Sequence, residues 1–554
     1  MKLKKLPYGL SDFKRVLQEN FYYFDKTKFL QTLEDDAEFL YFLRPRRFGK
    51  SLTIAMLEAY YDVYYKSQYE DIFKTTYIYQ NPTPLKSSFY VLRFDFSAVD
   101  TTDYESSFRN NIFSEIRFFK DKYNLDFNII DDNPIDNLRN LFDYCVSKSL
   151  PIYILIDEYD NFVTKLLVSD MNAYQNIVTS KSAIYKEFFT MLKYGTTGAV
   201  KKMFFTGVSP LALYDVTSGS NIGINISLHK AYNDMVGVTK DELNQLIKYY
   251  DLEDKKETIM NRCNEYYNSY RFNEDIKHTI YNSDMILYYF YSLVKEQEEP
   301  RDLIDVNVRT DYTKLKYLVY TNKKLNGNFE MLNNLILGNQ VGTTKIKDNF
   351  SAFELTNEDN FKSFMFSLGF MTLEKYRIAL TLKIPNQTIK KLLSEFIHYA
   401  YDDFDDYKIS TEQINNKLLD LAYEKDLSVF HYIAQMIKDS SSIRDFIDGE
   451  NYIKAYMLSY LNLNNFYQLK IKSEVEQNKG YIDILLEPVK EEVPYGVIIE
   501  LKYIKRSKFT KELLESKIKE AKEQLNQYDL GEKFVKIVLV FNGWEMVFCG
   551  EVER

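Results

Sequence analysis

Residues 38–57 read EFLYFLRPRRFGKSLTIAML, and this stretch decides the fold of the first third of the chain. The apolar residues 39–43 predict a short buried strand, and residues 52–57 follow a helical pattern. The loop between them ends in Gly49, Lys50 and Ser51. In a strand–loop–helix unit of this kind, backbone N–H groups and the helix N-terminus hold phosphate groups.

The loop predicts a nucleotide site. Lys50 would reach the β- and γ-phosphates, and the Ser51 hydroxyl would be a ligand to Mg²⁺. Arg44 stands where the general motif G-x-x-x-x-G-K-[ST] has its first glycine, and a helix start that carries Gly-Lys-Ser by chance is the alternative. The candidate nucleotide-binding residues of the loop are Arg46, Arg47, Phe48, Gly49, Lys50, Ser51 and Leu52.

Two further strands carry polar residues at their ends. The continuous apolar run 151–156 predicts a central parallel strand, and Asp157 and Glu158 follow it. Asp157 is placed to hold Mg²⁺ and Glu158 to activate the attacking water, whereas a solvated acidic loop is the alternative. Residues 202–205 predict another strand, after which Thr206 either senses the γ-phosphate or belongs to a plain turn.

The order of these elements favours an α/β fold. A fourth strand is predicted over residues 89–96, and helical patterns separate the strands. Strands that alternate with helices form a doubly wound parallel sheet, whose ligand lies at the carboxyl ends of the strands. We therefore expect a P-loop ATPase domain over residues 1–235 that binds ATP and Mg²⁺.

The middle of the chain, residues 236–440, has mostly helical periodicity and predicts a connector or lid. Thr239 and Glu242 have the spacing of a capping box at a helix start. Arg271 either contacts a phosphate or is a structural arginine stacked on aromatic rings.

Bulk properties limit the class of protein. A length of 554 residues predicts about three domains, and 45% hydrophobic with 27% charged residues is typical of a globular protein. The formal net charge of −9 means that any nucleic-acid contact must be a local patch. The three cysteines lie far apart in the sequence, which favours the reducing cytoplasm. No run approaches the ~18 apolar residues of a membrane span, so no membrane partner is expected.

A second group of charged residues lies near the C-terminus. Residues 481–486 and 497–502 are apolar runs that contain Asp483 and the tripeptide Glu500-Leu501-Lys502. Two adjacent strands would bring both carboxylates and the ammonium together. Carboxylates hold Mg²⁺ or Mn²⁺, and the metal lowers the pKa of a bound water while a lysine orients it. This pattern predicts a metal-dependent phosphodiesterase.

The flanking elements extend this prediction. We expect a helix over residues 449–461 that carries Glu450, a strand over 467–472, a helix over 511–528 and a strand over 535–541. Glu450 is either a helix-borne catalytic acid or a solvated residue. Gln524 and Tyr528 are spaced i, i+4 and would share one helix face.

This α-β-β-β-α-β series resembles the PD-(D/E)XK nuclease superfamily over residues 441–554. The resemblance implies a C-terminal α/β restriction-endonuclease-like domain with Asp483 and Glu500 as metal ligands, Lys502 as the catalytic lysine and Glu450 as the helix-borne acid. Gln524 and Tyr528 match a Gln-x-x-x-Tyr element of some of these nucleases. Tyr481 stands where the family usually has an arginine.

Residues 1 to about 300 resemble the AAA-ATPase-like family that carries a C-terminal nuclease-like domain. The matching stretches are residues 7–9, 23–27, 44–51, 157–160 and 266–272. In that family the loop Arg-Pro-Arg-Arg-Phe-Gly-Lys-Ser is the expected form, so Arg44 agrees with it. The resemblance implies ATP binding and hydrolysis.

These features together predict an ATP-dependent nuclease that acts on DNA in the cytoplasm. The alternative is a nucleotide-operated switch or scaffold whose nuclease fold binds nucleic acid or a partner without cutting. A homo-oligomer is a further possible assembly. Lys505, Arg506, Lys508 and Lys511 follow Lys502 without an intervening acid, and they either neutralise DNA phosphates or form a solvated basic loop.

Overall fold

The computed structural model divides the chain into two compact units, which we describe separately. Unit 1 comprises residues 1–300 and 343–386, and unit 2 comprises residues 301–342 and 387–554. The division predicted at residues 235 and 440 stays a prediction. The structure describes residues 3–130, 133–180, 183–211, 223–308, 329–376, 379–402, 410–439, 449–464, 469–477, 480–489 and 491–552.

Unit 1 contains a five-stranded sheet in the order β2-β3-β4-β1-β5, and its paired strands are parallel. Every residue of β3 is buried, as its uninterrupted apolar sequence predicts. The parallel α/β sheet confirms the predicted fold class. The strands are β1 (Phe39–Leu43), β2 (Tyr90–Asp95), β3 (Ile152–Asp157), β4 (Val200–Gly207) and β5 (Ile224–Asn225).

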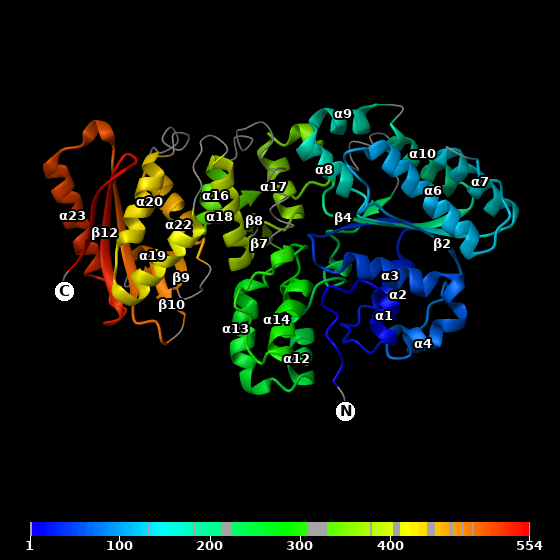
Figure 1. The fold of residues 1–554 in the computed structure, drawn as a ribbon, viewed down its shortest axis with the longest axis horizontal. Helices are drawn as coiled ribbons and strands as arrows, with labels where there is room; N and C mark the ends of the chain where they lie inside the picture. Colours follow the sequence, from blue (N-terminus) through cyan, green and yellow to red (C-terminus); the bar gives the residue numbers. More distant parts are fainter. Residues whose placement is uncertain are drawn as a thin grey trace. The chain divides into compact units, whose positions relative to one another are not determined.

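Helices cover both faces of this sheet (Figure 1). Helices α6, α7 and α10 lie on one face, and α3 lies on the other with α1 and α4 beside it. The helices of this part are α1 (Phe13–Gln18), α2 (Phe29–Asp35), α3 (Lys50–Tyr61), η1 (Val63–Gln68), α4 (Tyr69–Phe73), α5 (Tyr77–Gln80), α6 (Tyr104–Lys122), α7 (Pro134–Ser147), α8 (Asn161–Ser169), α9 (Met171–Thr179) and α10 (Ile184–Thr196).

The rest of unit 1 is mostly helical. The predicted capping box is present, because the Glu242 N–H donates to Thr239 Oγ1 at 3.2 Å and the Thr239 N–H donates to Glu242 Oε2 at 2.8 Å. A short antiparallel hairpin joins β7 and β8. The elements are η2 (Lys230–Tyr232), α12 (Lys240–Tyr249), η3 (Glu253–Lys255), α13 (Lys256–Tyr266), α14 (Ser283–Lys295), η5 (Ala352–Glu354), α17 (Glu358–Ser367), β7 (Thr372–Tyr376) and β8 (Ala379–Lys383).

Unit 2 is built on a second five-stranded sheet, in the order β13-β12-β11-β10-β9. Strands β11 and β12 are parallel, and the other neighbours are antiparallel. The predicted strand residues Tyr467 and Gln468 lie outside the described residues, and the sequence did not predict β13. The strands of this sheet are β9 (Leu469–Gln477), β10 (Gly480–Pro488), β11 (Gly496–Ile504), β12 (Phe534–Asn542) and β13 (Glu545–Glu551). A further strand, β6 (Val341–Thr343), is not part of this sheet, and the boundary between the two units falls within it.

Helices also lie on both sides of this sheet, with α23 on one side and α22, α19 and α20 on the other (Figure 1). A hydrophobic cluster that includes Ile498, Val538, Ala521 and Leu525 packs α23 against the strands. The helices are α16 (Phe329–Ile336), α18 (Gln387–Asp402), α19 (Thr411–Glu424), α20 (Ser428–Asp439), α22 (Glu450–Leu461), η6 (Arg506–Lys508) and α23 (Lys511–Leu525).

The predicted helix over residues 511–528 is too long by three residues, because α23 ends at Leu525. The N–H of Gln527 donates to the carbonyl oxygen of Gln524 at 3.0 Å, and that of Tyr528 donates to Leu525 at 3.2 Å. These i→i−3 bonds close the last turn as a tight turn rather than as α-helix. Tyr528 therefore lies beyond the helix and does not share a helix face with Gln524.

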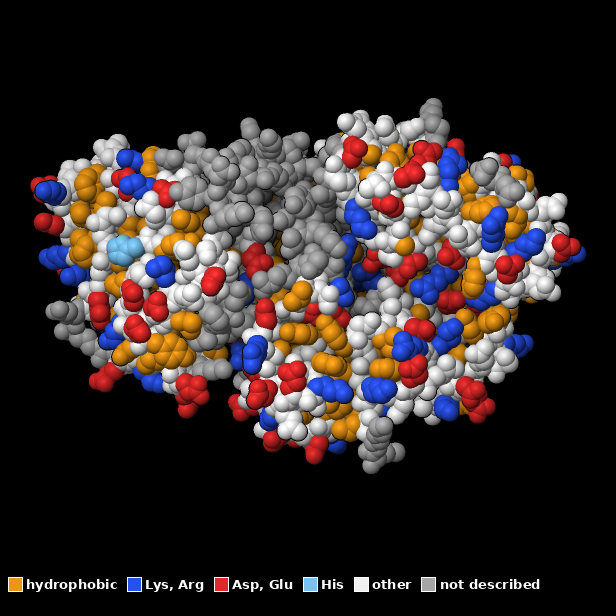
Figure 2. Space-filling view, in the orientation of Figure 1, with side chains coloured by type: hydrophobic (Ala, Val, Ile, Leu, Met, Phe, Trp, Pro, Cys, Tyr) orange, Lys and Arg blue, Asp and Glu red, His pale blue; other side chains and the backbone are white. Residues whose placement is uncertain are grey.

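Within the described part of the chain, no helix combines the length and the apolar character that a membrane crossing requires. On the face drawn in Figure 2, basic and acidic side chains are interspersed. This mixture agrees with the expectation that any contact with nucleic acid would be local.

Candidate functional site

The loop after β1 has the backbone that a phosphate-binding loop requires. Gly49 is the N-cap of α3 with φ 99°, a left-handed conformation that favours glycine. Lys50 follows as the first helical residue and is 7% exposed. Its ammonium donates to the carbonyl oxygens of Arg44 and Pro45, each at 3.0 Å. Burial lowers the pKa of Lys50, and the nearby Glu158 carboxylate opposes that shift.

Arg44, at the position of the motif's first glycine, has a structural role. Its guanidinium is 4.3 Å from the ring centre of Phe42 and 4.0 Å from that of Phe272. It also donates to the carbonyl oxygens of Ser227 and Tyr232. The side chain is 1% exposed, and burial lowers its pKa to about 9. Arg44 thus ties the loop to the segment after β5.

The remaining loop residues differ in what they present. Phe48 is 1% exposed and meets Tyr270 edge-on with ring centres 4.9 Å apart, so its ring belongs to the core. The Arg47 guanidinium lies 3.6 Å from a carboxylate oxygen of Asp284, at the start of α14. Three other predicted residues are half-buried in the loop or in the first turn of α3: Arg46, Ser51 and Leu52.

The predicted acidic group lies at the same sheet edge as the loop. Strand β4 separates β3 from β1, and Phe42 is in register with Thr206. The Thr206 hydroxyl donates to Asp157 Oδ1 at 2.6 Å, and Asp157 is 1% exposed. The structure therefore brings together the threonine and the aspartate that the sequence singled out, at the carboxyl ends of parallel strands where such sheets bind ligands.

Glu158 lies next to this pair in a left-handed conformation with φ 50°. The Asn161 amide donates to its Oε2 at 2.7 Å. Burial raises the pKa of Glu158, and the charges of Lys50 and Arg46 partly offset that shift. A carboxylate with a raised pKa is suited to accept a proton near neutral pH.

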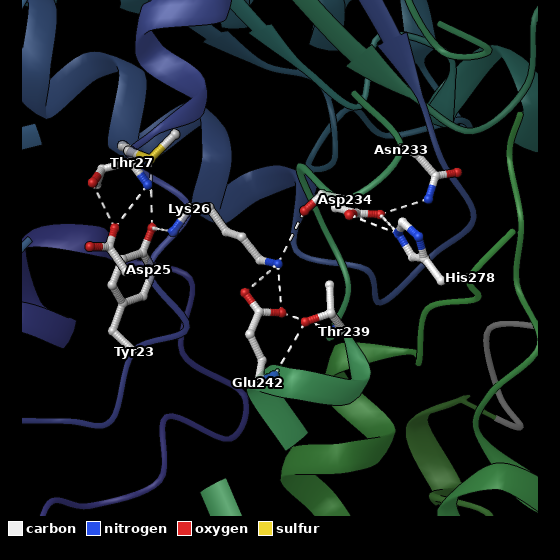
Figure 3. A network of polar contacts seen from close by, with 10 residues as sticks. Tyr23, Asp25, Lys26, Thr27, Asn233, Asp234, Thr239, Glu242 and His278 are labelled. Carbon is white, nitrogen blue, oxygen red and sulfur yellow. Dashed lines mark hydrogen bonds and ion pairs between the residues drawn. The ribbon is translucent and has the colours of Figure 1, made fainter. Parts of the chain in front are cut away.

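The segment Tyr23–Thr27, singled out as a family match, forms a polar network around the buried Lys26 (Figure 3). The Lys26 ammonium lies 2.7 Å from Glu242 Oε1 and 2.8 Å from Oε2, and it donates to the carbonyl oxygen of Asp234 at 3.1 Å. His278 Nε2 lies 2.8 Å from both carboxylate oxygens of Asp234. These contacts fix the N-terminal segment to α12, which gives the segment a structural role.

The C-terminal acids and lysine meet on β10 and β11. Ile484 is in register with Ile499, so Asp483 and Glu500 occupy opposite positions on the two antiparallel strands. The Leu501 N–H donates to Asp483 Oδ2 at 2.8 Å. The Lys502 ammonium donates to Glu500 Oε1 at 2.8 Å. The three residues are 7%, 3% and 7% exposed, in chain order.

Glu450 joins this cluster from the first turn of α22, where its carboxylate accepts the backbone N–H of Tyr503. Burial, followed by the charge of Asp483, raises the pKa of Glu450. The same two causes, in the same order, raise the pKa of Glu500 to about 7. The charge of Asp483 therefore acts on both Glu450 and Glu500.

Sequence reasoning missed two members of the cluster, Lys454 and Glu474. The Lys454 ammonium is 2.6 Å from Asp483 Oδ1 and also pairs with Glu474 Oε1. Lys454 was detectable, because it is one cation within an apolar helical run and follows Glu450 by one helical turn. Glu474 gave no such signal, because it is one of several charged residues that alternate with other residues in this stretch, which is ordinary for a partly exposed strand.

The two predicted residues near α23 approach the cluster differently. The Tyr528 hydroxyl donates to the carbonyl oxygen of Tyr481 at 3.0 Å, and burial, followed by the charges of Glu500 and Asp483, raises its pKa. Gln524 Oε1 is buried and has no hydrogen-bond partner among the described residues. Tyr528 thus supports the strand that carries Asp483.

The basic stretch after β11 is exposed. Arg506 stacks over Trp544, with its guanidinium 4.1 Å from the ring centre, and it approaches Glu545 at 4.0 Å. Lys508 and Lys511 are exposed. Part of this basic charge is therefore paired, and the two lysines remain on the surface beside the end of β11.

The donor chemistry of the cluster fits a hard divalent cation. Glu500 Oε2 is buried and lacks a hydrogen-bond partner among the described residues, so one carboxylate oxygen is available to a ligand. Within the same part of the chain, no group of three or more histidines, cysteines or acids is gathered closely enough to hold a metal ion. The fit therefore rests on Asp483 and Glu500, and Lys454 takes one oxygen of Asp483.

Comparisons with known proteins agree with this division of chemistry. Residues 7–217 match the family model described as "Predicted AAA-ATPase", and residues 448–551 match that of the PD-(D/E)XK nuclease superfamily. Comparison with curated proteins gives no match.

Two solved structures show only a weak likeness. The Aeropyrum pernix ORC2 protein, in ADPNP–ADP complexes, has 10% identity and a TM-score of 0.31, covering 70% of this chain and 98% of its own. Cdc6p from Pyrobaculum aerophilum has 11% identity and a TM-score of 0.23, covering 65% and 87%. At these scores neither structure carries an argument. The family models identify residues 7–217 as a predicted AAA-ATPase domain and residues 448–551 as a domain of the PD-(D/E)XK nuclease superfamily.

Proposed function

We propose that this protein binds and hydrolyses ATP and cleaves DNA in a metal-dependent reaction that ATP controls. The observation that carries the nuclease half is the meeting of Asp483, Glu500 and Lys502, with Glu450 at their side and with Glu500 Oε2 unpartnered among the described residues. The observation that supports the ATPase half is the shared sheet edge of the loop and of Asp157.

In the ATPase half, each residue has a defined task. The loop N–H groups and the first turn of α3 bind the phosphates, and Lys50 turns from the carbonyl oxygens of Arg44 and Pro45 to the β- and γ-phosphates. Ser51 and Asp157 would hold Mg²⁺. Glu158 is the candidate base for the attacking water, and its raised pKa suits that task.

In the nuclease half, Asp483 and Glu500 would hold Mg²⁺ or Mn²⁺. Such an ion polarises a phosphate and acidifies a bound water. Lys502 is fixed by Glu500 and is buried, so it presents its charge at one place and orients the nucleophile. Glu450 adds a third carboxylate to the cluster, where it would accept a proton. The exposed Lys508 and Lys511 lie after β11 and would contact backbone phosphates.

The second candidate function is a nucleotide-operated switch or scaffold whose nuclease fold binds without cutting. One specific observation favours it: Lys454 already neutralises Asp483. If that pair persists in the presence of metal, the cluster is a structural ion-pair network rather than a catalytic centre.

Cleavage of linear and supercoiled DNA with Mg²⁺ or Mn²⁺, measured with and without ATP, separates the two candidates. The variants are Asp483→Asn, Glu500→Gln and Lys50→Met, with Glu551→Gln as an exposed acidic control on β13. The proposal expects Asp483→Asn and Glu500→Gln to abolish cleavage, Lys50→Met to abolish its response to ATP, and Glu551→Gln to change neither. Wild-type protein that hydrolyses ATP and binds DNA but cuts it with neither metal would establish the switch instead.

A further inference from the structure

Lys454 lies where an incoming cation would meet Asp483. It is 3% exposed, and its neighbours Ile453 and Ala455 on α22 are also buried, so the helix holds this side chain at the cluster. Its ammonium is 2.6 Å from Asp483 Oδ1. A lysine this buried is retained only where its charge is matched.

The partner that shares this ammonium, Glu474, is in an unusual position. The pairing of Ile482 with Val475, and of Ile484 with Ser473, places Glu474 opposite Asp483 on the neighbouring strand. Two like charges at opposite positions are unfavourable, and Glu474 also has φ 51°, which is uncommon for a residue other than glycine. The ammonium between the two carboxylates offsets their repulsion.

The two carboxylates that would hold a metal are therefore not equally available. Both oxygens of Asp483 have partners, because Oδ2 accepts the Leu501 N–H and Oδ1 accepts Lys454. Glu500 pairs with Lys502 through Oε1 only, and its Oε2 is free of partners among the described residues. Lys502 thus leaves one oxygen of Glu500 open to a cation, whereas Lys454 occupies the one oxygen of Asp483 that the Leu501 N–H does not hold.

We propose that Lys454 is an internal counter-ion that competes with the divalent metal for Asp483 Oδ1, and that Glu474 keeps Lys454 paired when the metal displaces it. This inference rests on the proposed function in one respect, that Asp483 and Glu500 are metal ligands. Lys454 is then a positioning residue that sets the affinity of the site for metal. Glu474, whose side chain is 41% exposed, gives the displaced ammonium a partner at the edge of the cluster.

The competition follows from electrostatics. An ammonium and a divalent ion cannot both contact one carboxylate oxygen without repulsion between them, and this repulsion is strong where water is scarce. Competition by the ammonium makes the binding free energy of the metal less favourable, and each 1.4 kcal/mol lost weakens the affinity tenfold. Removal of the Lys454 charge should therefore tighten metal binding by about tenfold or more.

Isothermal titration of the full-length protein with Mn²⁺ at pH 8, without ATP, tests the inference. Asp483→Asn identifies the heat that belongs to this site. Lys454→Met is expected to bind Mn²⁺ about tenfold more tightly than wild type. Lys472→Met is the matched control, because Lys472 pairs with Glu487 at another place on β9 and its loss changes the net charge equally. Lys472→Met should leave the Kd for Mn²⁺ within about twofold of the wild-type value.

Two further variants keep the result interpretable. Lys454→Arg keeps the charge and should bind Mn²⁺ as weakly as wild type. The double variant Lys454→Met with Glu474→Gln restores the net charge and removes the opposed acid, so it relieves any folding defect of the single variant. If wild type binds Mn²⁺ weakly because Lys454 occupies Asp483 Oδ1, the double variant still binds Mn²⁺ more tightly than wild type. A return to the wild-type Kd would show a general charge effect and overturn the proposal.

The other outcomes are equally decisive. Mn²⁺ binding by wild type at Asp483, with no tighter binding in Lys454→Met, refutes the role of Lys454 and leaves the proposed nuclease site intact. An absence of Mn²⁺ binding in wild type and in every variant, with circular dichroism showing folded protein, refutes the metal site and the inference together.

Discussion

The contact between Lys26 and Glu242 makes a quantitative prediction for the fold of unit 1. The side chains of Lys26 and Glu242 are 11% and 19% exposed, and the ammonium contacts both carboxylate oxygens. Glu242→Gln keeps the shape of the side chain and an oxygen that can accept the Thr239 N–H of the capping box. The substitution therefore removes the charge that matches Lys26 and little else.

The expected loss in free energy of unfolding is large, although Glu242→Gln changes only one oxygen to an amide nitrogen. Loss of one partner from a buried ion pair costs about 3–5 kcal/mol, because the remaining charge is left without compensation. The residual exposure of both side chains argues for the lower end, about 3 kcal/mol. Unit 1 has roughly 340 residues and hence an entropy of unfolding of about 0.7 kcal/mol/K, so this cost corresponds to a fall in Tm of about 4 °C.

Differential scanning calorimetry of wild type, Glu242→Gln and a matched Glu19→Gln control measures this cost. Glu19 pairs with Arg15 on the surface, with side chains 48% and 54% exposed, so its neutralisation should cost less than about 0.5 kcal/mol. Addition of Lys26→Met to Glu242→Gln should restore stability, because a buried ion pair is replaceable by apolar groups.

The effect should also depend on pH. Burial lowers the pKa of Lys26, so its folded-state pKa lies below that of the unfolded chain. The unfolded chain therefore binds more protons than the folded one, so stability rises with pH, and the cost of Glu242→Gln should shrink as the pH rises toward the ordinary lysine pKa of 10.5. Equal costs for Glu242→Gln and Glu19→Gln would show that the Lys26–Glu242 pair contributes no more to stability than an exposed ion pair does.

Three more outcomes follow from single contacts. Thr206→Val removes the hydroxyl that donates to Asp157 at 2.6 Å, and should slow ATP turnover and cost about 1 kcal/mol, measured by phosphate release and thermal melts. Burial and the charge of Asp483 raise the pKa of Glu500 from 4.5 to about 7. The contribution of Glu500 to stability is therefore fully present below pH 4.5 and is lost as the pH rises through 7. The Tm should fall between pH 5 and 8, and Glu500→Gln should remove this dependence on pH. Gly480→Ala would place a Cβ 2.8 Å from the Tyr528 hydroxyl, and should cost about 1–3 kcal/mol in denaturant unfolding.

The sequence was most informative where local pattern and chemistry agree. An apolar strand, Gly49-Lys50-Ser51 and a helical run can form only a few local structures, and the structure has the predicted strand, loop and helix. The sequence predicted that Asp157 and Thr206 lie near the carboxyl ends of two strands, and the structure has them there, with Thr206 the last residue but one of β4. The carboxyl ends of neighbouring parallel strands meet at one edge of a sheet. The roles of the two residues in binding Mg²⁺ and sensing phosphate stay predictions.

The sequence was least informative where a side chain's partners come from elsewhere in the chain. Lys454 and Asp483 lie 29 residues apart, and nothing local shows that a helical lysine will reach a strand aspartate. The helix end at Leu525 depends on i→i−3 bonds, which differ from the α-helical pattern by a small change in dihedral angle. Arg44 reads as a departure from a motif until its contacts with Phe42 and Phe272 are known.

Anomalous diffraction from crystals of the full-length protein soaked in Mn²⁺ would reveal whether Asp483 and Glu500 bind a metal ion together. We expect one strong peak about 2.0–2.6 Å from both Asp483 Oδ1 and Glu500 Oε2, with the Lys454 ammonium displaced toward Glu474. A cluster that stays closed around the Lys454–Asp483 pair at high Mn²⁺, without a peak, would contradict this expectation.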